Sequence, residues 1–503
     1  MPDARDAVTG CAIDPAVARR IPYHAARAHG VLAARQVGEA IELLVRADAS
    51  VNALAEARRL LGMPLLPVAL SIEDFDAGLA QAYAREDTQA ARLMDDLEQD
   101  IDLSALAQEL PTVGDLLEAE DDAPIIRLIN ALLTQALREG ASDIHLEAYE
   151  NRSALRFRVD GLLRDVMAPP RALHAALVSR IKVMASLDIA EKRLPQDGRI
   201  ALRLAGHPVD VRVSTLPTGH GERVVLRLLD KRQGRLELEA LGMSATTLRG
   251  LDALIRAPHG ILLVTGPTGS GKTTTLYAAL SRLDAARQNI MTVEDPIEYD
   301  LDQISQTQVN PRIDLTFARA LRAILRQDPD VVMIGEIRDL ETAQIAVQAS
   351  LTGHLVLATL HTNDAIGAVT RLADMGIEPY LLATSLIGVL GQRLVRRLCE
   401  KCKRAAPPDA RETALLATHG VDRLMHPVGC GHCNDSGYHG RTGIYELFTL
   451  DDAARRLIHD GGSEEALRAA AARNGWISLF DDGLRWVAAG ETSLEEVMRV
   501  ARA

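Results

Sequence analysis

An eight-residue run of glycine, hydroxyl and lysine residues carries the most definite chemistry in this sequence. It reads Gly266, Pro267, Thr268, Gly269, Ser270, Gly271, Lys272 and Thr273, and it fits the phosphate-binding pattern G-x-x-x-x-G-K-[ST]. In that pattern backbone N–H groups wrap the phosphates, the lysine reaches the β- and γ-phosphates, and the next hydroxyl binds Mg²⁺. Residues 266–273, here called the phosphate loop, therefore predict binding of a nucleoside triphosphate with Mg²⁺.

The residues on both sides of the phosphate loop support the same interpretation. Residues 261–265 are an apolar run suited to a buried parallel strand, and residues 274–280 can start a helix. The N-terminus of a helix favours negative charge, so this order places phosphates where the helix dipole helps. The alternative, a glycine-rich turn that matches by chance, explains neither flank.

Carboxylates end two further predicted strands, where phosphate-loop enzymes keep an acid for Mg²⁺ or its waters. Residues 292–299 place three carboxylates, including Glu294, at one strand end. Residues 331–334 form a second apolar strand, followed by Gly335 and Glu336. Gly335 stands where an aspartate is common, so we expect contact with Mg²⁺ to run through water to Glu336. Either carboxylate alone would also fit an exposed strand end.

Two histidines flank a third predicted strand, residues 355–360. His354 precedes this strand and His361 follows it. We treat both as candidates for sensing the γ-phosphate or a neighbouring domain. The alternative for each is a structural role in the packing around the strand.

Four of the five cysteines form two pairs with metal-ligand spacing. Cys399 and Cys402 make the first pair, Cys430 and Cys433 the second, and Cys11 stands alone. Two Cys-x-x-Cys pairs are typical of a structural four-thiolate Zn²⁺ site, which leaves no open position for a substrate. Unligated thiols or a redox role are the alternatives.

Composition excludes some classes of function. The chain has 503 residues, a net charge of −13 and only 3% aromatic residues, which argues against a surface that binds nucleic acid. Residues 1–11 lack the apolar core of a signal peptide, and the longest apolar stretch, residues 381–390, is too short to span a bilayer. We expect a cytoplasmic protein with no direct membrane insertion.

Periodicity and charge divide the chain into segments. Residues 1–90 are rich in Ala and Leu and look mostly helical, whereas residues 91–122 carry eleven Asp or Glu against one Arg. Helical spacing over residues 124–140 gives way at Ala141 to period-two alternation on strands with many arginines. From about residue 237 strands and helices alternate, which predicts a largely parallel sheet. We expect a partner-docking helical domain at 1–90, an acidic linker at 91–122, an α+β middle domain at 123–236, an α/β nucleotide-binding core at 237–395, a four-cysteine insertion at 396–440 and a helical end at 441–503.

Several motifs in order resemble the secretion ATPases that drive type II secretion, type IV pili and type IV secretion. The phosphate loop and residues 292–299, 328–339 and 352–363 match their Walker A, Asp box, Walker B and His box. Further matches lie at residues 141–147, 194–199, 218–223 and 440–446. The sequence is most similar to the type II secretion assembly ATPases, the E component of the general secretory pathway. Pilus-extension and competence ATPases, with the same chemistry in a different machine, are the alternative.

The resemblance implies a RecA-like core, a PAS-like middle domain, a homohexamer and an ATPase cycle. It implies that Lys272 and Thr273 serve phosphate and Mg²⁺, that Glu294 activates the attacking water and that Glu336 is the acid on the magnesium side, although these two could exchange roles. It assigns Arg212 and Arg227 of the middle domain to the γ-phosphate. It also implies docking, at the cytoplasmic face of the inner membrane, on the L component and the platform protein, the F component.

Overall fold

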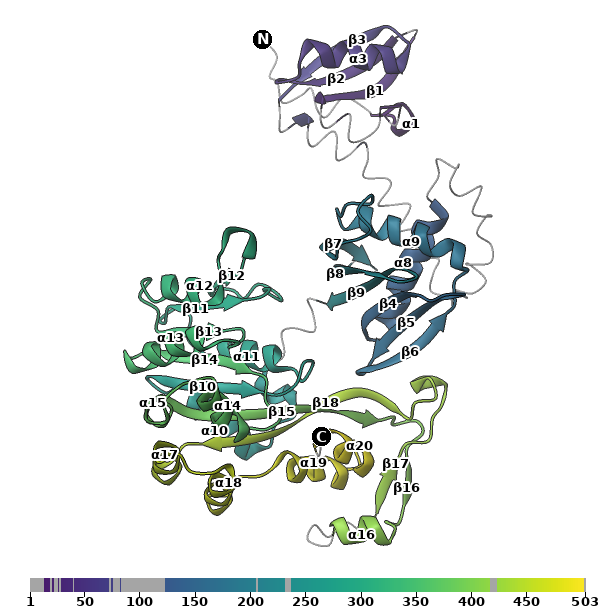
Figure 1. Ribbon diagram of the computed structural model, residues 1–503. Coiled ribbons are helices and arrows are strands. Elements are labelled where there is room, and N and C mark those ends of the chain that lie inside the picture. The colour runs from purple at the N-terminus through teal and green to yellow at the C-terminus, as the bar shows by residue number, and fades with distance from the viewer. Residues whose placement is uncertain are drawn as a thin grey trace. The chain divides into compact units, whose positions relative to one another are not determined.

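The structure, a computed structural model, describes residues 13–18, 20–21, 26, 29–38, 40–71, 74–75, 82, 123–204, 207–230, 237–416 and 423–501 (Figure 1). Its backbone divides into two compact units. The first holds the elements from Pro15 to Leu70, and the second holds nearly all of the elements from Ala123 onwards. The predicted acidic linker at 91–122 and Cys11 lie outside the described residues.

The described residues of the first unit form a three-stranded sheet with helices α1 and α3. Its elements are α1 (Pro15–Ala18), β1 (Val31–Val37), β2 (Ala40–Arg46), α3 (Val51–Leu61) and β3 (Leu65–Leu70). The strands lie in the order β1-β2-β3, with β1 and β2 antiparallel and β2 and β3 parallel.

The prediction of a mostly helical module over residues 1–90 is therefore wrong for the described residues. Ala and Leu favour helices only weakly, and packing overrides that preference. Residues 31–34 are buried one after another, as in a strand covered on both faces, and Gly38 at φ +62° turns the chain into β2.

The middle domain follows the predicted α+β pattern. Its elements are α8 (Ala123–Arg138), β4 (Ala141–Ala148), β5 (Ser153–Val159), β6 (Leu162–Met167), α9 (Arg171–Met184), β7 (Gln196–Leu204), β8 (His207–Thr218) and β9 (Gly221–Asp230). The strands form one sheet in the order β6-β5-β4-β9-β8-β7. The predicted helix at 124–140 is confirmed within two residues.

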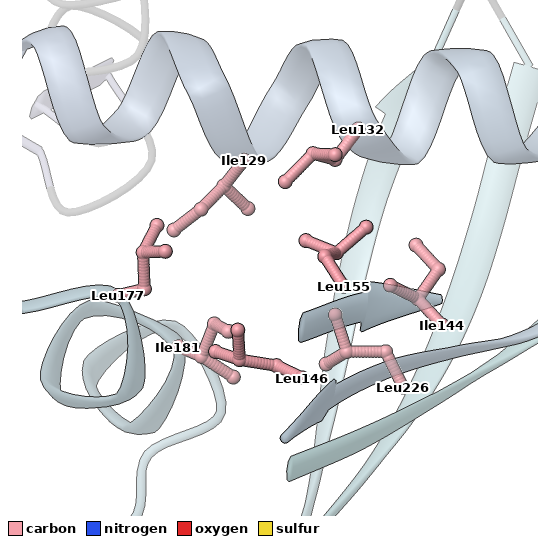
Figure 2. Close-up of a pocket in the computed structure, with 8 residues that line it drawn as sticks. All are labelled: Ile129, Leu132, Ile144, Leu146, Leu155, Leu177, Ile181 and Leu226. Atoms are coloured by element: carbon pink, nitrogen blue, oxygen red, sulfur yellow. The ribbon is translucent and has the colours of Figure 1, made fainter. Parts of the chain in front are cut away.

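Helices α8 and α9 cover the apolar face of this sheet. Figure 2 shows the side chains that meet there around a cavity of about 10 Å³, which is too apolar to hold an ordered water. They are Ile129, Leu132, Ile144, Leu146, Leu155, Leu177, Ile181 and Leu226. The helical spacing in α8 and the alternation in β4 thus meet in one dry core.

The opposite face of the sheet carries a row of charged residues. Asp143 on β4 is the register partner of Arg227 on β9, and Arg227 is the partner of Arg212 on β8. Register partners point to the same face, so the two arginines predicted to serve the γ-phosphate lie side by side.

The nucleotide-binding core is a seven-stranded sheet in the order β12-β11-β13-β14-β10-β15-β18 (Figure 1). All neighbours pair in parallel except β15 and β18. The elements up to the last parallel strand are η3 (Leu238–Leu241), α10 (Ala245–Ile255), β10 (Gly260–Thr265), α11 (Lys272–Leu280), β11 (Ile290–Glu294), β12 (Ser305–Gln308), η4 (Pro311–Ile313), α12 (Phe317–Ile324), β13 (Val331–Ile334), α13 (Leu340–Leu351), β14 (Leu355–Leu360), α14 (Gly367–Asp374), α15 (Pro379–Ser385) and β15 (Leu386–Leu398).

Helices cover both faces of this sheet, which is why its strands are continuous apolar runs. On β10, Ile261 and Leu263 pack with α12 to α15, whereas Leu262 and Val264 pack with α10 and α11. All six residues of β10 are buried. The carboxyl ends of the parallel strands therefore gather at one edge of the sheet, where ligands of open α/β folds bind.

The cysteine-bearing segment is an excursion between the two longest paired strands of the core. It holds β16 (Arg404–Ala406), α16 (Ala410–Leu416), β17 (Leu424–His426) and η5 (Gly431–Cys433), and it leads into β18 (Tyr438–Thr449). Because β15 and β18 pair from Gly388 to Leu398, the predicted limits at residues 395–396 and 440–441 fall inside strands.

The C-terminal helices are α17 (Asp452–His459), α18 (Glu464–Arg473), α19 (Leu479–Ala488) and α20 (Leu494–Ala501). The predicted helical end at 441–503 thus begins with nine residues of the core sheet, because the apolar side chains of β18 pack into the core. None of the described helices has the length and apolar character needed to cross a bilayer.

Candidate active site

The phosphate loop connects β10 to the first turn of α11, as the sequence predicts. Gly266 has φ +148°, and a Cβ at that position would lie 2.3 Å from the backbone oxygen of Gln392 on β15. Gly271 has φ +87° and caps α11 in the left-handed region, where a side chain is strained. The Gln392 side chain holds the loop from behind, since its Nε2 donates to Ser270 O at 2.7 Å and its Oε1 accepts from Thr275 Oγ1 at 2.7 Å.

Lys272 is folded into the phosphate loop. Its Nζ donates to Gly266 O at 2.6 Å and to Pro267 O at 3.2 Å. Burial lowers the pKa of Lys272 to about 8, against the opposing attraction of Glu336. Thr273 is exposed, and the buried Ser270 Oγ has no hydrogen-bond partner among the described residues. An ammonium, an open hydroxyl and an unpaired buried hydroxyl at a helix N-terminus fit a phosphate chain with its Mg²⁺.

A polar chain runs from the phosphate loop to Glu336. Lys272 Nζ lies 3.4 Å from His361 Nδ1, and His361 Nε2 lies 3.0 Å from Glu336 Oε1. Burial first, and then the charge of Lys272, lower the pKa of His361. A neutral imidazole that accepts at Nδ1 and donates from Nε2 satisfies both neighbours. Arg338 Nε donates to Glu336 Oε2 at 2.8 Å and completes the chain.

The two histidines predicted to sense the γ-phosphate lie at opposite ends of β14. His361 is at the carboxyl end, beside Lys272, but His354 precedes the first residue of the strand. Six strand residues separate them, or about 20 Å. The Nδ1 of His354 lies 2.8 Å from Ala349 O, at the end of α13. Within one chain His354 therefore contacts the end of α13, and its sensing of the γ-phosphate or of a neighbouring domain stays a prediction.

Glu294 ends β11 in a closed polar cluster. The residue is 2% exposed, and its carboxylate accepts hydrogen bonds from Thr292 Oγ1 at 2.5 Å, from Gln306 Nε2 at 3.0 Å and from the hydroxyl of Tyr277. A carboxylate that already accepts three hydrogen bonds has little capacity left to hold and deprotonate a water.

Glu298 is a residue of this segment that the sequence interpretation did not select. Its side chain is 34% exposed, and Oε2 lies 2.8 Å from Arg212 Nη2. Arg212 also donates to Ile297 O at 3.1 Å. The sequence signal that could have found Glu298 was Pro296, because proline ends a strand in the interior of a sheet. Glu298 follows this proline and lies in a loop, whereas Glu294 precedes it and lies in the sheet.

The two predicted arginines have different partners. Arg212 reaches the segment that carries Glu298, whereas Arg227 Nε donates to Asp143 Oδ1 within its own sheet at 2.9 Å. The structure thus brings together the phosphate loop, His361 and Glu336, and separately Arg212 and Glu298.

The four cysteines converge at the end of the β15–β18 hairpin. Their sulfur atoms all lie within 4.8 Å of one another, with Sγ–Sγ distances of 3.9 Å for Cys399 and Cys430 and 3.8 Å for Cys402 and Cys433. Four thiolates at the Zn–S distance of 2.3 Å define a tetrahedron with edges of about 3.8 Å, whereas a disulfide needs about 2 Å. The geometry fits a tetrahedral metal ion.

Backbone N–H groups favour the thiolate form of one of these four cysteines. Burial works against ionisation of Cys433, but the N–H groups of Cys430 and Gly437, each 3.2 Å from its sulfur, together with the neighbouring thiols outweigh burial and lower its pKa to about 7, whereas burial raises the pKa of Cys402 to about 11. Hydrogen bonds of this kind orient metal-binding sulfurs.

Known families match nearly the whole chain. The family described as Type II/IV secretion system protein matches residues 118–499, and a domain family of GSPII protein E matches residues 20–83. Type II secretion system protein E of Dickeya dadantii is 59% identical over 96% of this chain and 97% of its own length. Type II secretion system ATPase E of Vibrio cholerae is 59% identical over 91% of each chain.

Solved structures agree with the fold. The pilus retraction motor PilT with bound ADP is 26% identical, covers 75% of this chain and 97% of its own, and gives a TM-score of 0.50. The Legionella pneumophila ATPase DotB, at 20% identity, covers 75% of this chain and 96% of its own with a TM-score of 0.56, and supports the fold alone. The chain therefore belongs to the Type II/IV secretion system protein family, and it is an ATPase of the type II secretion system.

Proposed function

We propose that this chain is the motor of type II secretion. It hydrolyses ATP at the phosphate loop, drives assembly of the pseudopilus and so exports folded proteins from the periplasm across the outer membrane. The observation that carries the proposal is the chain of contacts from Lys272 through His361 to Glu336. These contacts join the phosphate loop, which follows β10, to the carboxylate that follows β13. The names of its relatives favour type II secretion over pilus extension.

The proposed roles follow from the contacts. Lys272 neutralises the β- and γ-phosphates, and Thr273 and Glu336 hold Mg²⁺ and its water. When bound, Mg²⁺ neutralises charge that develops on the phosphates. Glu298 holds and deprotonates the attacking water, because it is partly exposed whereas Glu294 is enclosed by three donors. Arg212, beside Glu298, supplies positive charge to the γ-phosphate, and Arg227, its register partner in the same row, adds to that charge.

The assembly is proposed to be a homohexamer at the cytoplasmic face of the inner membrane. The N-terminal domain docks on the cytoplasmic part of the L component, and the ATPase works on the platform protein, the F component. The match of residues 20–83 to a domain of its own supports a separate docking module. The six-stranded sheet with helices on one face supports a PAS-like middle domain, and the sulfur spacing supports structural Zn²⁺.

Phosphate release by the purified full-length protein tests the proposed site. Lys272→Ala abolishes hydrolysis, and Glu298→Gln lowers kcat more than Glu294→Gln does. Wild-type turnover by Lys272→Ala would reject the site, and wild-type kcat in Glu298→Gln would reject that residue's role alone. Co-purification of the full chain, but not of a chain lacking residues 1–90, with the L component's cytoplasmic domain tests the docking module.

A further inference from the structure

Tyr277 occupies an unusual position on the phosphate-loop helix. It lies five residues after Lys272, or about 7.5 Å along α11, and it is fully buried. Its hydroxyl donates to Glu294 Oε2 and accepts from the backbone N–H of Glu298 at 3.3 Å and from Gln306 Nε2 at 3.3 Å. One oxygen atom therefore contacts both ends of the turn between Glu294 and Glu298.

The same turn is held further along by the partners of Tyr277. Gln306 Nε2 also donates to Tyr299 O at 3.3 Å, and Gln306 Oε1 accepts from Leu301 N at 2.7 Å. The ring of Tyr299 packs edge-on against the ring of Tyr277, with centroids 4.6 Å apart. Residues 295–301 are thus fastened to α11 through Tyr277, and to β12 through Gln306.

A buried tyrosine is often only a space-filling core residue. Here the hydroxyl makes three hydrogen bonds, and all three partners belong to the carboxylate-bearing segment or to the strand beside it. Burial, and then the hydrogen bond to Glu294, raise the pKa of Tyr277 well above its usual range, so the hydroxyl keeps its proton and remains a donor at every physiological pH.

We propose that Tyr277 is a positioning residue for ATP hydrolysis, because its hydroxyl fixes the turn that carries Glu298 relative to the helix that begins at Lys272. The inference rests on the proposed role of Glu298. The phosphates are held at the N-terminus of α11, and the water-side carboxylate is held one and a half turns further along the same helix. The distance between the carboxylate and the γ-phosphate is then set by a single rigid element.

Tyr277→Phe tests the inference, because it removes one oxygen and keeps the ring. Tyr438→Phe is the matched control, since Tyr438 is also buried, at 8% exposure, and its hydroxyl lies 2.7 Å from Ser493 Oγ, away from the turn and from the phosphate loop. We expect Tyr277→Phe to lower kcat by about tenfold or more while the Kd for ATP stays within about twofold, since small misplacements of catalytic groups have effects of that order. Tyr438→Phe changes neither.

Hydrogen–deuterium exchange of the full-length protein gives a readout that does not depend on activity. Peptides covering residues 295–301 exchange faster in Tyr277→Phe than in Tyr438→Phe. Equal kcat and equal exchange in the two variants would overturn the inference. Measuring kcat of Glu298→Gln separates the two proposals. A wild-type kcat in Glu298→Gln would reject the catalytic role of Glu298, whereas faster exchange in Tyr277→Phe would still show that Tyr277 holds the turn. If Tyr277→Phe does not fold, Gln306→Leu releases the same turn from β12, and unchanged kcat and exchange there would overturn the inference equally.

Discussion

The ammonium of Lys272 and the carboxylate of Glu336 are bridged by one imidazole, that of His361, with 3.4 Å on the lysine side and 3.0 Å on the glutamate side. The bridge needs the imidazole neutral, because an imidazolium has no acceptor for the lysine. Burial and the charge of Lys272 keep the imidazole neutral, since they lower the pKa of His361.

The bridge predicts an acid limb in the pH profile of hydrolysis that belongs to His361. Because the pKa in the folded protein is lowered, the stabilising contribution is complete above the usual value of about 6.5 and is lost as pH falls through the folded value. We therefore expect kcat to fall as the pH drops below the pKa of His361 in the folded protein. His361→Gln keeps a donor and an acceptor that do not titrate, so it flattens this limb, whereas His361→Ala lowers kcat at all pH values. An unchanged limb in His361→Gln would assign it to another group.

Glu446 on β18 predicts a second, opposite dependence on pH. Burial raises its pKa to about 7, against the N–H groups of Ala365 and Leu479, which donate to its carboxylate at 2.5 Å and 3.3 Å. A raised pKa in an acid stabilises the fold fully below about 4.3 and loses that contribution as pH rises through 7, a change of roughly 3 kcal/mol. Thermal melts from pH 5 to pH 8 should show this decline, and Glu446→Gln should flatten it. A parallel decline in both proteins would contradict the assignment.

The glycines of the phosphate loop predict unequal effects of alanine. At Gly266 a Cβ would lie 2.3 Å from Gln392 O, so Gly266→Ala displaces the loop from β15 and abolishes ATP binding. At Gly269 no atom lies within 4 Å, and only the backbone conformation at φ +80° opposes a side chain. That strain costs about 1–2 kcal/mol, so Gly269→Ala should weaken ATP binding by about tenfold. Titration with a fluorescent nucleotide measures the Kd of both variants, and equal Kd values would contradict the predicted difference between Gly266 and Gly269.

The cysteine cluster predicts a metal content that depends on all four thiolates. Cys430→Ser should lower Zn²⁺ from about one ion per chain to a small fraction and should lower the melting temperature. Cys11→Ser makes the same chemical change outside the cluster and should leave both unchanged. Elemental analysis by mass spectrometry checks the metal, and pure wild-type protein without zinc would reject the site.

Sequence alone predicted the parts of the site that are local in the chain. The phosphate loop, the strands beside it and the pairing of cysteines follow from short motifs, so their residues could be named. The network around Tyr277 could not be predicted, because it depends on β11 and β12 being neighbours in the sheet. His354 was a candidate sensor of the γ-phosphate or of a neighbouring domain because both ends of a strand look alike in a sequence, and of the two histidines the structure brings His361 beside Lys272.

The sheet in the first unit was missed for a different reason. Residues 31–34 contain no polar residue, and a short apolar run has no period that separates a strand from a helix. Glu298 was passed over because three carboxylates in one turn differ only in burial and partners, which packing decides. In both places the information lies in contacts between segments rather than in the segments themselves.

Strand β15 touches the back of the phosphate loop at Gln392 and runs on without a break to Leu398, next to Cys399. Its register against β18 determines which side chains face the loop, since a slip of one residue would turn Gln392 away and present a neighbour instead. The four sulfurs close the open end of this hairpin. By holding the ends of β15 and β18 together, the four sulfurs fix the register of the hairpin. Gln392, further along β15, therefore keeps its position against the phosphate loop.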